Sequence, residues 1–587
     1  MTDRAADLAR GLAVHPAAQG YLVVRGDRGE RSYMLGPRTQ LDELDGSPPM
    51  LDWHTAPLAA AFFAAAPGEP FELETGAELH VVERWLVQRG GLVGDEVAID
   101  AGGNARPIAR PAPAKIAPPD REALVVLDPD QQRAVDLPAD TSLVVDGEAG
   151  VGKTLVALHR AASLARRAAE KSRRFRALML VPTEGLRRLC RLIADRLEIP
   201  RLEIAVLDDW LVARARKAFT GLPARLSEGA TAQVIALKRH PAVRVVLDEF
   251  RGWKPPRDDD KLPRSRARLL HLWGDEPRLT RIAETGGLPE RAIAAVRKHT
   301  RLQFEHTTER MHRHVDAERL VALDGRALDA GTTREDVHTF DAEDVPVLFE
   351  LARRGALPPV ELPVYDHIIV DEAQLRAPME LAAIGDARAP NGTVTLAGDH
   401  RQATDETAYF AGWLAARGEL RAQRWAEITL AVTYRSVPAI ADFARTFELP
   451  ADNGAVWASA CDGSLAQVAE LCWHLDALIT RDPWRQICVI ARTPEHARRL
   501  AHELGRGLAP ALVLDGDFRF EPGVIVTTAA AVSGLEFDCV VIPDLSPPFY
   551  PYGSAELARA LYVAATRARD WLWLLTPEAW SPLVTRP

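Results

Sequence analysis

The chain has 587 residues and a mass of 64.4 kDa, more than a single hydrophobic core usually serves, so several domains are expected. A hydrophobic content of 47% without an apolar run near ~18 residues excludes a membrane helix, and the N-terminus lacks a secretory signal, so we expect a cytoplasmic protein without a membrane partner. The net charge of −10 leaves a nucleic-acid partner open, because basic groups can be confined to one groove.

The chain begins with a predicted β-rich module at residues 1–104. From residue 20 onward, short apolar runs alternate with Gly and Asp turns, as in GYLVVRG, RSYMLG and HVVERWLVQRGG, and this pattern predicts β-strands. Residues 105–122 include ARPIARPAPAKIAPPD, whose prolines cannot sustain a helix or a central strand. A stiff linker and a domain boundary are therefore expected there.

After the linker, the pattern changes to that of an α/β fold. Wholly apolar strands alternate with long helices, first in SLVVDG and VGKTLVALHRAASLARRA, and this alternation predicts a parallel sheet covered on both faces. We assign 123–211 and 363–422 to a first α/β domain, and the charged, helical stretch 212–362 to an insertion in it. A second series of strands, in ICVIAR, GVIVTT, DCVVIPD and DWLWLL, assigns 423–587 to a second α/β domain.

A glycine-rich phosphate-binding loop follows the first apolar strand of the first domain. The segment GEAGVGKT matches G-x-x-x-x-G-K-[ST] between a strand and a helix, as that pattern requires. Its backbone N–H groups can close around phosphates, Lys153 can reach the β- and γ-phosphates of ATP, and Thr154 can ligate Mg²⁺. The candidate nucleotide-binding residues of the loop are Gly147, Glu148, Ala149, Gly150, Val151, Gly152, Lys153 and Thr154.

Two adjacent acids follow a second apolar strand, in YDHIIVDEAQ. Asp371 can hold Mg²⁺ through water, and Glu372 can accept a proton from the water that attacks the γ-phosphate. An Asp-Glu pair at a strand end is by itself more often a solvated turn. Its place after a phosphate-binding loop favours the catalytic interpretation.

Phosphoryl transfer also needs cations from outside the phosphate-binding loop, because negative charge gathers on the γ-phosphate. The candidates are Arg435 in VTYRSVPAI and Arg567 in LYVAATRARDWL, both in the second α/β series. If the two domains face each other, these arginines would couple hydrolysis to domain closure. An isolated arginine is usually a surface charge, so this assignment depends on a family resemblance.

Seven segments within residues 127–570 resemble, in order, the motifs of superfamily 1 helicases of the UvrD/Rep type: LDPDQQRAV, GEAGVGKT, VDEAQ, GDHRQ, TYRS, SGLEF and YVAATRA. The resemblance implies two RecA-like domains that hydrolyse ATP with Mg²⁺ and translocate 3′-to-5′ on single-stranded or partly duplex DNA. It also implies that Gln131 reads the adenine and Tyr434 stacks on it. By the same resemblance, Gln402 senses the γ-phosphate and Glu536 lies near the ribose.

Within that superfamily, the chain is most similar to the HelD, or helicase IV-like, branch, whose members bind RNA polymerase. The segments that carry this similarity are GKTLVALHRAASL, GDHRQAT, GLEFDCVVIPD, LYVAATRA and MLDWHTAPLAAAFF. Two further functions therefore stay open beside a DNA translocase. One is an ATPase that remodels RNA polymerase or a repair protein, and the other is a nucleotide-gated switch that hydrolyses ATP slowly.

Segments that contact DNA in UvrD-type enzymes differ here. TAAAVSGLEF has Ala530 and Ser533 where His and Lys are common. The aromatics that directly follow GDxxQ are absent, but Tyr409, Phe410 and Trp413 come a few residues later. These three side chains either stack on bases or pack a helix against its own core.

A local basic excess runs from Arg160 to Arg201. Such a run is either a surface that binds phosphates of a nucleic acid or a solvated helix face. The sequence leaves both interpretations open.

Overall fold

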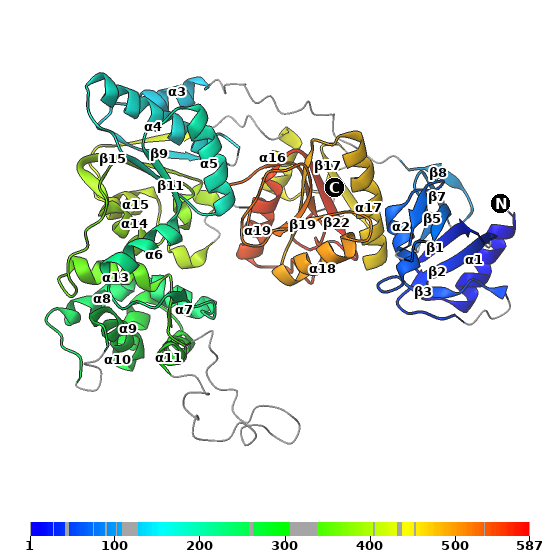
Figure 1. The fold of residues 1–587 in the computed structure, drawn as a ribbon, viewed down its shortest axis with the longest axis horizontal. Helices are drawn as coiled ribbons and strands as arrows, with labels where there is room; N and C mark the ends of the chain where they lie inside the picture. Colours follow the sequence, from blue (N-terminus) through cyan, green and yellow to red (C-terminus); the bar gives the residue numbers. More distant parts are fainter. Residues whose placement is uncertain are drawn as a thin grey trace, which may run out of the picture. The chain divides into compact units, whose positions relative to one another are not determined.

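The computed structural model describes residues 2–27, 29–41, 46–73, 75–88, 91–100, 102–108, 127–148, 150–256, 262–305, 337–402, 405–430, 437–450, 454–532 and 534–585 (Figure 1). The chain forms two compact units. One unit comprises Met1–Val125 with Thr433–Pro587, and the other comprises Val126–Val432. Within the described residues, no helix combines the length and the apolar character needed to cross a membrane.

The first unit begins with a β-rich module, as the alternating sequence predicts. Its sheet has the order β3-β2-β1-β5-β6-β7-β8, with β4 also paired to β5. The elements are α1 (Thr2–Val14), β1 (Gly20–Gly26), β2 (Gly29–Gly36), β3 (Met50–Asp52), α2 (Ala60–Ala64), β4 (Pro70–Glu72), β5 (Glu78–Gln88), β6 (Gly91–Val93), β7 (Val97–Asp100) and β8 (Ala105–Pro107). Because β8 pairs with β7, the module extends into the predicted linker 105–122, of which residues 109–122 lie outside the described part.

The second α/β domain belongs to the same unit. Its sheet is parallel throughout, with the order β17-β22-β21-β18-β20-β19. The elements are α16 (Pro438–Thr446), β17 (Val456–Ala460), α17 (Ser464–Arg481), β18 (Gln486–Ala491), α18 (Pro494–Leu504), β19 (Ala511–Leu512), β20 (Gly523–Thr528), β21 (Phe537–Ile542), α19 (Ala555–Ala565) and β22 (Ala568–Thr576). Strands β18, β21 and most of β22 are buried along their length, as expected for a sheet covered on both faces.

The module and this domain share one hydrophobic core. Phe62 of α2 lies 5.2 Å from Trp473 of α17 between ring centroids, and the Trp473 indole N–H donates to the Phe62 carbonyl at 2.8 Å. The Arg84 guanidinium of β5 lies 4.4 Å above the same Trp473 ring. The module is therefore built onto the second α/β domain by buried aromatic contacts.

The second unit contains the first α/β domain, whose parallel sheet has the order β11-β10-β14-β15-β9-β16. The elements are α3 (Pro129–Asp136), β9 (Ser142–Gly147), α4 (Lys153–Glu170), β10 (Ala177–Val181), α5 (Glu184–Arg196), β11 (Leu202–Val206), α6 (Leu207–Ala218), β14 (Tyr365–Val370), α14 (Pro378–Gly385), β15 (Arg388–Gly398), α15 (Trp413–Leu420) and β16 (Trp425–Leu430). Both domains thus confirm the α/β fold class with two RecA-like parallel sheets.

Strand β16 corrects the boundary that we placed at residue 423. It pairs with β9 in the first sheet, so it does not belong to the second α/β domain. β16 lies at the edge of the sheet, and only Ile428 and Leu430 of its six residues are buried. Because only one face of β16 is covered, its sequence WAEITL is not wholly apolar as the other strands are, and the pattern of apolar strands did not assign it to the first sheet.

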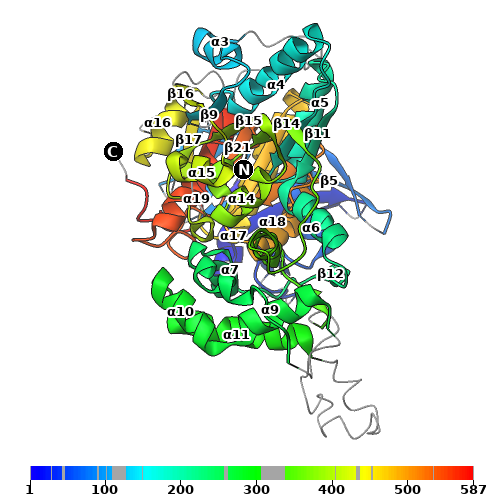
Figure 2. The ribbon, with the colours of Figure 1, turned by 90° about the vertical axis from the view of Figure 1, so that its left-hand side faces the viewer.

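The stretch 212–362 is mainly helical in its described part, as predicted, and α6 crosses its first boundary. Its elements are β12 (Arg225–Leu226), α7 (Ala232–Arg239), α8 (Arg244–Leu247), α9 (Arg264–Gly274), α10 (Glu276–Gly286), α11 (Glu290–Phe304), β13 (Thr339–Phe340) and α13 (Asp344–Arg353). Figure 2 shows α7, α9, α10 and α11 gathered at one end of the unit. Their apolar side chains continue the core of the first α/β domain, so the insertion is packed firmly on that domain.

Candidate active site

The loops that carry the predicted catalytic residues meet because their strands are neighbours. β15 lies between β9 and β14, and all three strands are parallel, so their carboxyl ends share one edge of the sheet. In register, Gly398 pairs with Asp146, and Leu396 pairs with Val370. The glycine-rich loop after β9, the acidic pair after β14 and GDHRQ after β15 therefore open onto one site.

The glycine-rich loop has a backbone that other residues would not adopt easily. Gly150 and Gly152 have φ angles of 79° and 83°, in the left-handed region that favours glycine. A Cβ at Gly152 would lie 2.8 Å from the Gln131 side-chain amide nitrogen. Helix α4 begins at Lys153 without a side-chain cap, so its first N–H groups point toward the loop, as a phosphate site requires. Ala149 lies outside the described residues.

The Lys153 ammonium lies against the loop. It is 8% exposed and donates to the carbonyls of Gly147 and Glu148, each at 2.8 Å. These neutral acceptors hold the lysine at the loop that is predicted to bind phosphates. A phosphate oxygen can replace a carbonyl there and forms a stronger, charge-assisted bond.

Thr154 and Asp371 come together although 217 positions separate them in the sequence. The Thr154 hydroxyl donates to the Asp371 carboxylate at 2.7 Å, and Asp371 is 1% exposed. Burial, and after it the charge of Glu372, raises the pKa of Asp371 to about 7. A hydroxyl beside two buried carboxylates is a donor set that fits Mg²⁺, because a divalent cation would offset the charge that burial disfavours.

Glu372 is held by a neighbour that the sequence analysis missed. Its backbone is left-handed, with φ 49° and ψ 44°, a conformation that costs a non-glycine residue about 1–3 kcal/mol. The Gln374 amide donates to the Glu372 carboxylate at 2.6 Å, and the Gln374 carbonyl oxygen accepts from the Asp399 N–H at 3.3 Å. A Cβ at Gly398 would lie 2.2 Å from that oxygen. Gln374, already visible in VDEAQ, thus ties Glu372 to GDHRQ.

The turn of GDHRQ contacts the glycine-rich loop directly. Arg401 donates to the Glu148 carboxylate at 2.6 Å, and His400 lies 3.0 Å from the Asp146 carboxylate. Gln402 ends the same 3-10 helix, η8 (His400–Gln402). The structure therefore places the backbone of the predicted γ-phosphate sensor in a turn attached to the glycine-rich loop.

Gln131 also lies at this loop, in the first turn of α3. Its side-chain carbonyl accepts from the Asp128 N–H at 3.1 Å, and its amide donates to the Val151 carbonyl at 2.9 Å. The residue is 4% exposed. Gln131 thus connects the helix cap to the glycine-rich loop, and its contact with adenine stays a prediction.

The predicted site residues of the second α/β domain are only partly described. Arg567 is 3% exposed and donates to the carbonyls of Val563 at 3.0 Å and Leu535 at 3.2 Å. Glu536, which follows Leu535, is half-buried. Tyr434 and Arg435 lie outside the described residues. Arg567 therefore faces its own domain here, and its role as an arginine finger stays a prediction.

The aromatic residues after GDHRQ pack inside the second unit. The Tyr409 hydroxyl donates to the Ala236 carbonyl at 2.9 Å, and its ring meets His240 edge-on at 4.3 Å between centroids. Phe410 and Trp413 contact each other at 4.9 Å, and Trp413 is 7% exposed. This agrees with the packing alternative.

In the second α/β domain Ala530 is exposed, and Ser533 is not among the described residues.

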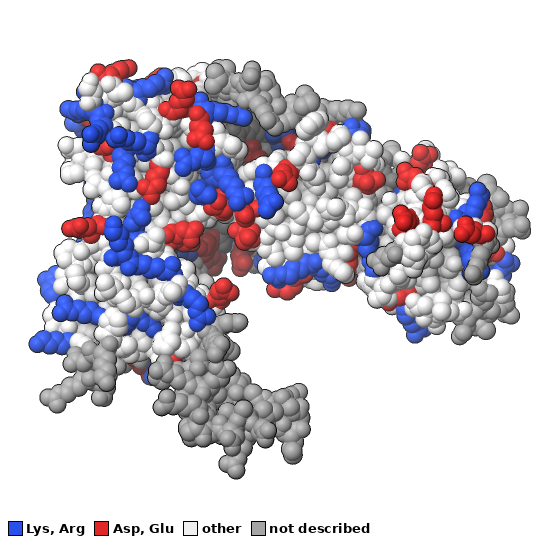
Figure 3. All heavy atoms as spheres, viewed as in Figure 1, with Lys and Arg blue, Asp and Glu red and all other residues white. Residues whose placement is uncertain are grey.

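The basic run from Arg160 to Arg201 is partly structural. Arg160 is fully buried and donates to backbone carbonyls such as that of Thr141, and burial lowers its pKa to about 10. Arg187 and Arg188 are paired with Glu184. Figure 3, which has the same view as Figure 1, shows acidic side chains among the basic ones in the region of α4 and α5. The run is therefore not a continuous phosphate-binding surface.

Comparisons with known proteins bear on the end of the chain. Residues 523–575 match the UvrD-like helicase C-terminal domain family. The solved structure of the C-terminal domain of a possible DNA helicase from Lactobacillus plantarum WCFS1 is 26% identical, with 26% of this chain and 92% of that chain covered and a TM-score of 0.23. No curated protein matches the chain. The residues that match the family include Glu536 and Arg567.

Proposed function

We propose that the protein is an ATP hydrolase of the superfamily 1 helicase type that translocates on single-stranded or partly duplex DNA. The observation that carries the ATPase is the 2.7 Å hydrogen bond from Thr154 to Asp371, which joins the glycine-rich loop to the acidic pair. The match of 523–575 to UvrD-like helicase C-terminal domains supports the helicase class. Polarity 3′-to-5′ and a cytoplasmic location are further parts of this proposal.

In this proposal the residues of the first domain divide the work. The glycine-rich loop and Lys153 bind the phosphates, and Thr154 and Asp371 would hold Mg²⁺, which when bound supplies positive charge at the β- and γ-phosphates. Glu372 accepts the proton of the attacking water as the bond from the γ-phosphorus to the bridging oxygen breaks, which yields ADP and phosphate. Gln374 orients Glu372 through their 2.6 Å hydrogen bond. Arg435 and Arg567 would stabilise the charge on the transferred group from the second domain.

ATP turnover of the whole chain, measured with and without single-stranded DNA, tests the proposal. We expect turnover that DNA stimulates strongly, and Lys153→Ala should abolish it, because this variant lacks the ammonium held at the loop carbonyls. An ATPase that ignores DNA would contradict the translocase. Turnover near that of the wild type in Lys153→Ala would contradict the assigned site.

A second candidate is a HelD-like ATPase that remodels RNA polymerase or a repair-protein complex. The observation that favours it is the position of Tyr409. Its side chain packs against the helical insertion, through Ala236 and His240, and is therefore not free to stack on a base. An ATPase that DNA leaves unchanged but purified RNA polymerase stimulates would favour this candidate over the first.

A further inference from the structure

One arginine of the helical insertion contacts both the loop of Glu372 and the segment that follows GDHRQ. Arg239 ends α7 and is 10% exposed. Its guanidinium donates to both Glu380 oxygens at 3.0 and 3.3 Å, and to the Leu375 carbonyl at 3.0 Å. It also donates to the Thr407 hydroxyl at 2.8 Å and to the Asp405 carboxylate. A single planar group thus holds acceptors from three separate segments.

Two of those segments follow the catalytic residues closely. Leu375 ends the turn after Glu372, and its own N–H donates to the Glu372 carbonyl at 3.0 Å. Asp405 and Thr407 come shortly after Gln402 in the sequence. Arg239 therefore spans the loop of the predicted general base and the segment that follows the predicted γ-phosphate sensor.

The charge of Arg239 is compensated in place. Burial disfavours the guanidinium charge, but the carboxylates of Glu380 and Asp405 outweigh this effect and raise the pKa of Arg239. Arg239 in turn holds the pKa of Asp405 below its usual range, against the opposite effect of burial. Removing the arginine leaves two partly buried acids without their partner, so the loops would have to rearrange.

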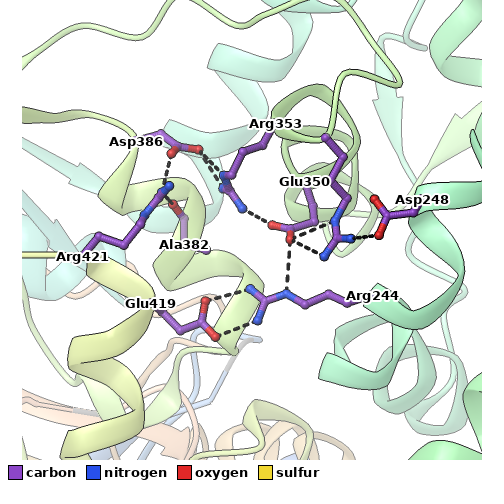
Figure 4. A network of polar contacts seen from close by, with 9 residues as sticks. Arg244, Asp248, Glu350, Arg353, Ala382, Asp386, Glu419 and Arg421 are labelled. Atoms are coloured by element: carbon purple, nitrogen blue, oxygen red, sulfur yellow. Dashed lines mark hydrogen bonds and ion pairs between the residues drawn. The ribbon is translucent and has the colours of Figure 1, made fainter. Parts of the chain in front are cut away.

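A second contact keeps the end of α7 beside the same segment. The Tyr409 hydroxyl donates to the Ala236 carbonyl, and the Tyr409 ring packs on His240. Arg244, also in the insertion, provides a contrast: it binds Glu419 of α15 through two bonds of 2.7 Å and also pairs with Glu350 of α13 (Figure 4). Its partners belong to helices rather than to the catalytic loops.

We propose that Arg239 is a positioning residue for ATP hydrolysis, which ties the loop of Glu372 to the segment of Asp405 and Thr407 that follows GDHRQ, and so couples the helical insertion to the active site. This inference rests on the proposed function. A molecule that binds the insertion and moves α7 would change turnover through this side chain, without touching the nucleotide.

The test compares steady-state ATP hydrolysis of the whole chain with that of Arg239→Gln. We expect kcat to fall about 10- to 100-fold, because small displacements of catalytic groups have effects of this size. KM for ATP should change less than about threefold, because Lys153, Thr154 and the glycine-rich loop make no bond to Arg239 among the described contacts. Arg239→Lys keeps the positive charge but not the guanidinium's several N–H donors, so its kcat should lie between that of the wild type and that of Arg239→Gln.

The matched control is Arg244→Gln, which removes a comparable ion pair from the same insertion and should leave kcat within about twofold. Thr407→Val is a milder variant, which deletes one acceptor of Arg239 and should lower kcat with unchanged KM even if Arg239→Gln does not fold. An equal loss in Arg244→Gln, or unchanged kcat in folded Arg239→Gln and Thr407→Val, overturns the inference. A wild-type chain without ATP turnover would instead overturn the proposed function.

Discussion

At the scale of single residues, the structure separates arginines that look alike in the sequence. Arg160 and Arg567 both stand in segments that suggest phosphate contacts, yet both are buried and donate to backbone carbonyls. Arg239 belongs to no motif, yet it contacts the loop of Glu372 and the segment that follows GDHRQ. Partners therefore decide the role of a buried arginine, because its charge must be compensated wherever it lies.

Arg567→Ala tests the finger assignment at this scale. We expect turnover to fall by about 10³-fold if the side chain reaches the nucleotide during hydrolysis. The thermal midpoint should also fall, because Arg567 holds the Val563 and Leu535 carbonyls. Arg569→Ala is the control, since Arg569 is 44% exposed and pairs with Asp538 nearby. A lower thermal midpoint with unchanged turnover per folded molecule would show that Arg567 is structural only.

His367 makes the stability of the folded chain depend on pH in a direction that follows from its lowered pKa. Burial, then the charge of Arg160, lowers the pKa of His367 to about 3, and the ring hydrogen-bonds to the Thr393 and Thr395 hydroxyls. The unfolded chain binds this proton near pH 6.5, so the contribution to stability is present above that pH and is lost as the pH falls toward 3. At pH 5 the loss is about 2 kcal/mol.

Denaturant unfolding of the wild type and of His367→Gln, at pH 7.5 and pH 5, measures this effect. The glutamine variant should lose less stability between the two pH values, because it keeps a polar side chain but has no titrating ring. Equal losses in both proteins would show that His367 does not control the acid sensitivity.

At the scale of elements, a buried ionic cluster holds the insertion together. Lys238 of α7 is fully buried and binds Asp341 at 2.5 Å and Asp344 at 2.7 Å. The His299 ring of α11 and the Trp273 indole N–H of α9 bond to the same acids. The cluster thus joins the start of α13 to three other helices. One of its members, Lys238, directly precedes Arg239 in the sequence.

Lys238→Met should destabilise the insertion by about 3–5 kcal/mol, because it leaves two buried acids without a cation. Limited proteolysis should then cleave the insertion faster, while the second α/β domain keeps its resistance. The triple variant Lys238→Met, Asp341→Asn, Asp344→Asn should regain part of the loss. If it is no more resistant than Lys238→Met, uncompensated charge is not the cause.

At the scale of the whole molecule, the salt dependence of DNA binding tests whether DNA is a partner of this acidic chain. The paired arginines of α5 and the buried Arg160 weaken the case for the basic run. A translocating protein should still contact several phosphates. For single strands, each phosphate contact makes the slope of log affinity against log salt concentration more negative by about 0.7.

We expect a slope steeper than about −2 for single-stranded DNA, together with different affinities in the presence of ADP and of a non-hydrolysable ATP analogue. Fluorescence anisotropy with a labelled oligonucleotide over a salt series measures both. A protein that shows no binding at low salt in every nucleotide state is not a DNA translocase, and the protein-remodelling function would then replace it.

Features that depend on neighbouring residues along the chain could be predicted from the amino-acid sequence alone. Apolar strands alternating with helices identified both parallel sheets, and the glycines of GEAGVGKT identified the strand-to-helix loop. The acidic pair after β14 was equally visible. A local pattern suffices in these cases, because strand burial, loop conformation and helix start depend on a few adjacent residues.

Contacts between residues that are distant in the sequence became visible only in the folded chain. The edge strand β16 joined the first sheet, Phe62 packed on Trp473 of another domain, and Arg239 reached Leu375 and Thr407. None of these contacts has a local signature. The physical reason is that burying a charge or an aromatic ring is stabilised by whichever partners the fold brings near, and their spacing along the chain does not encode that proximity.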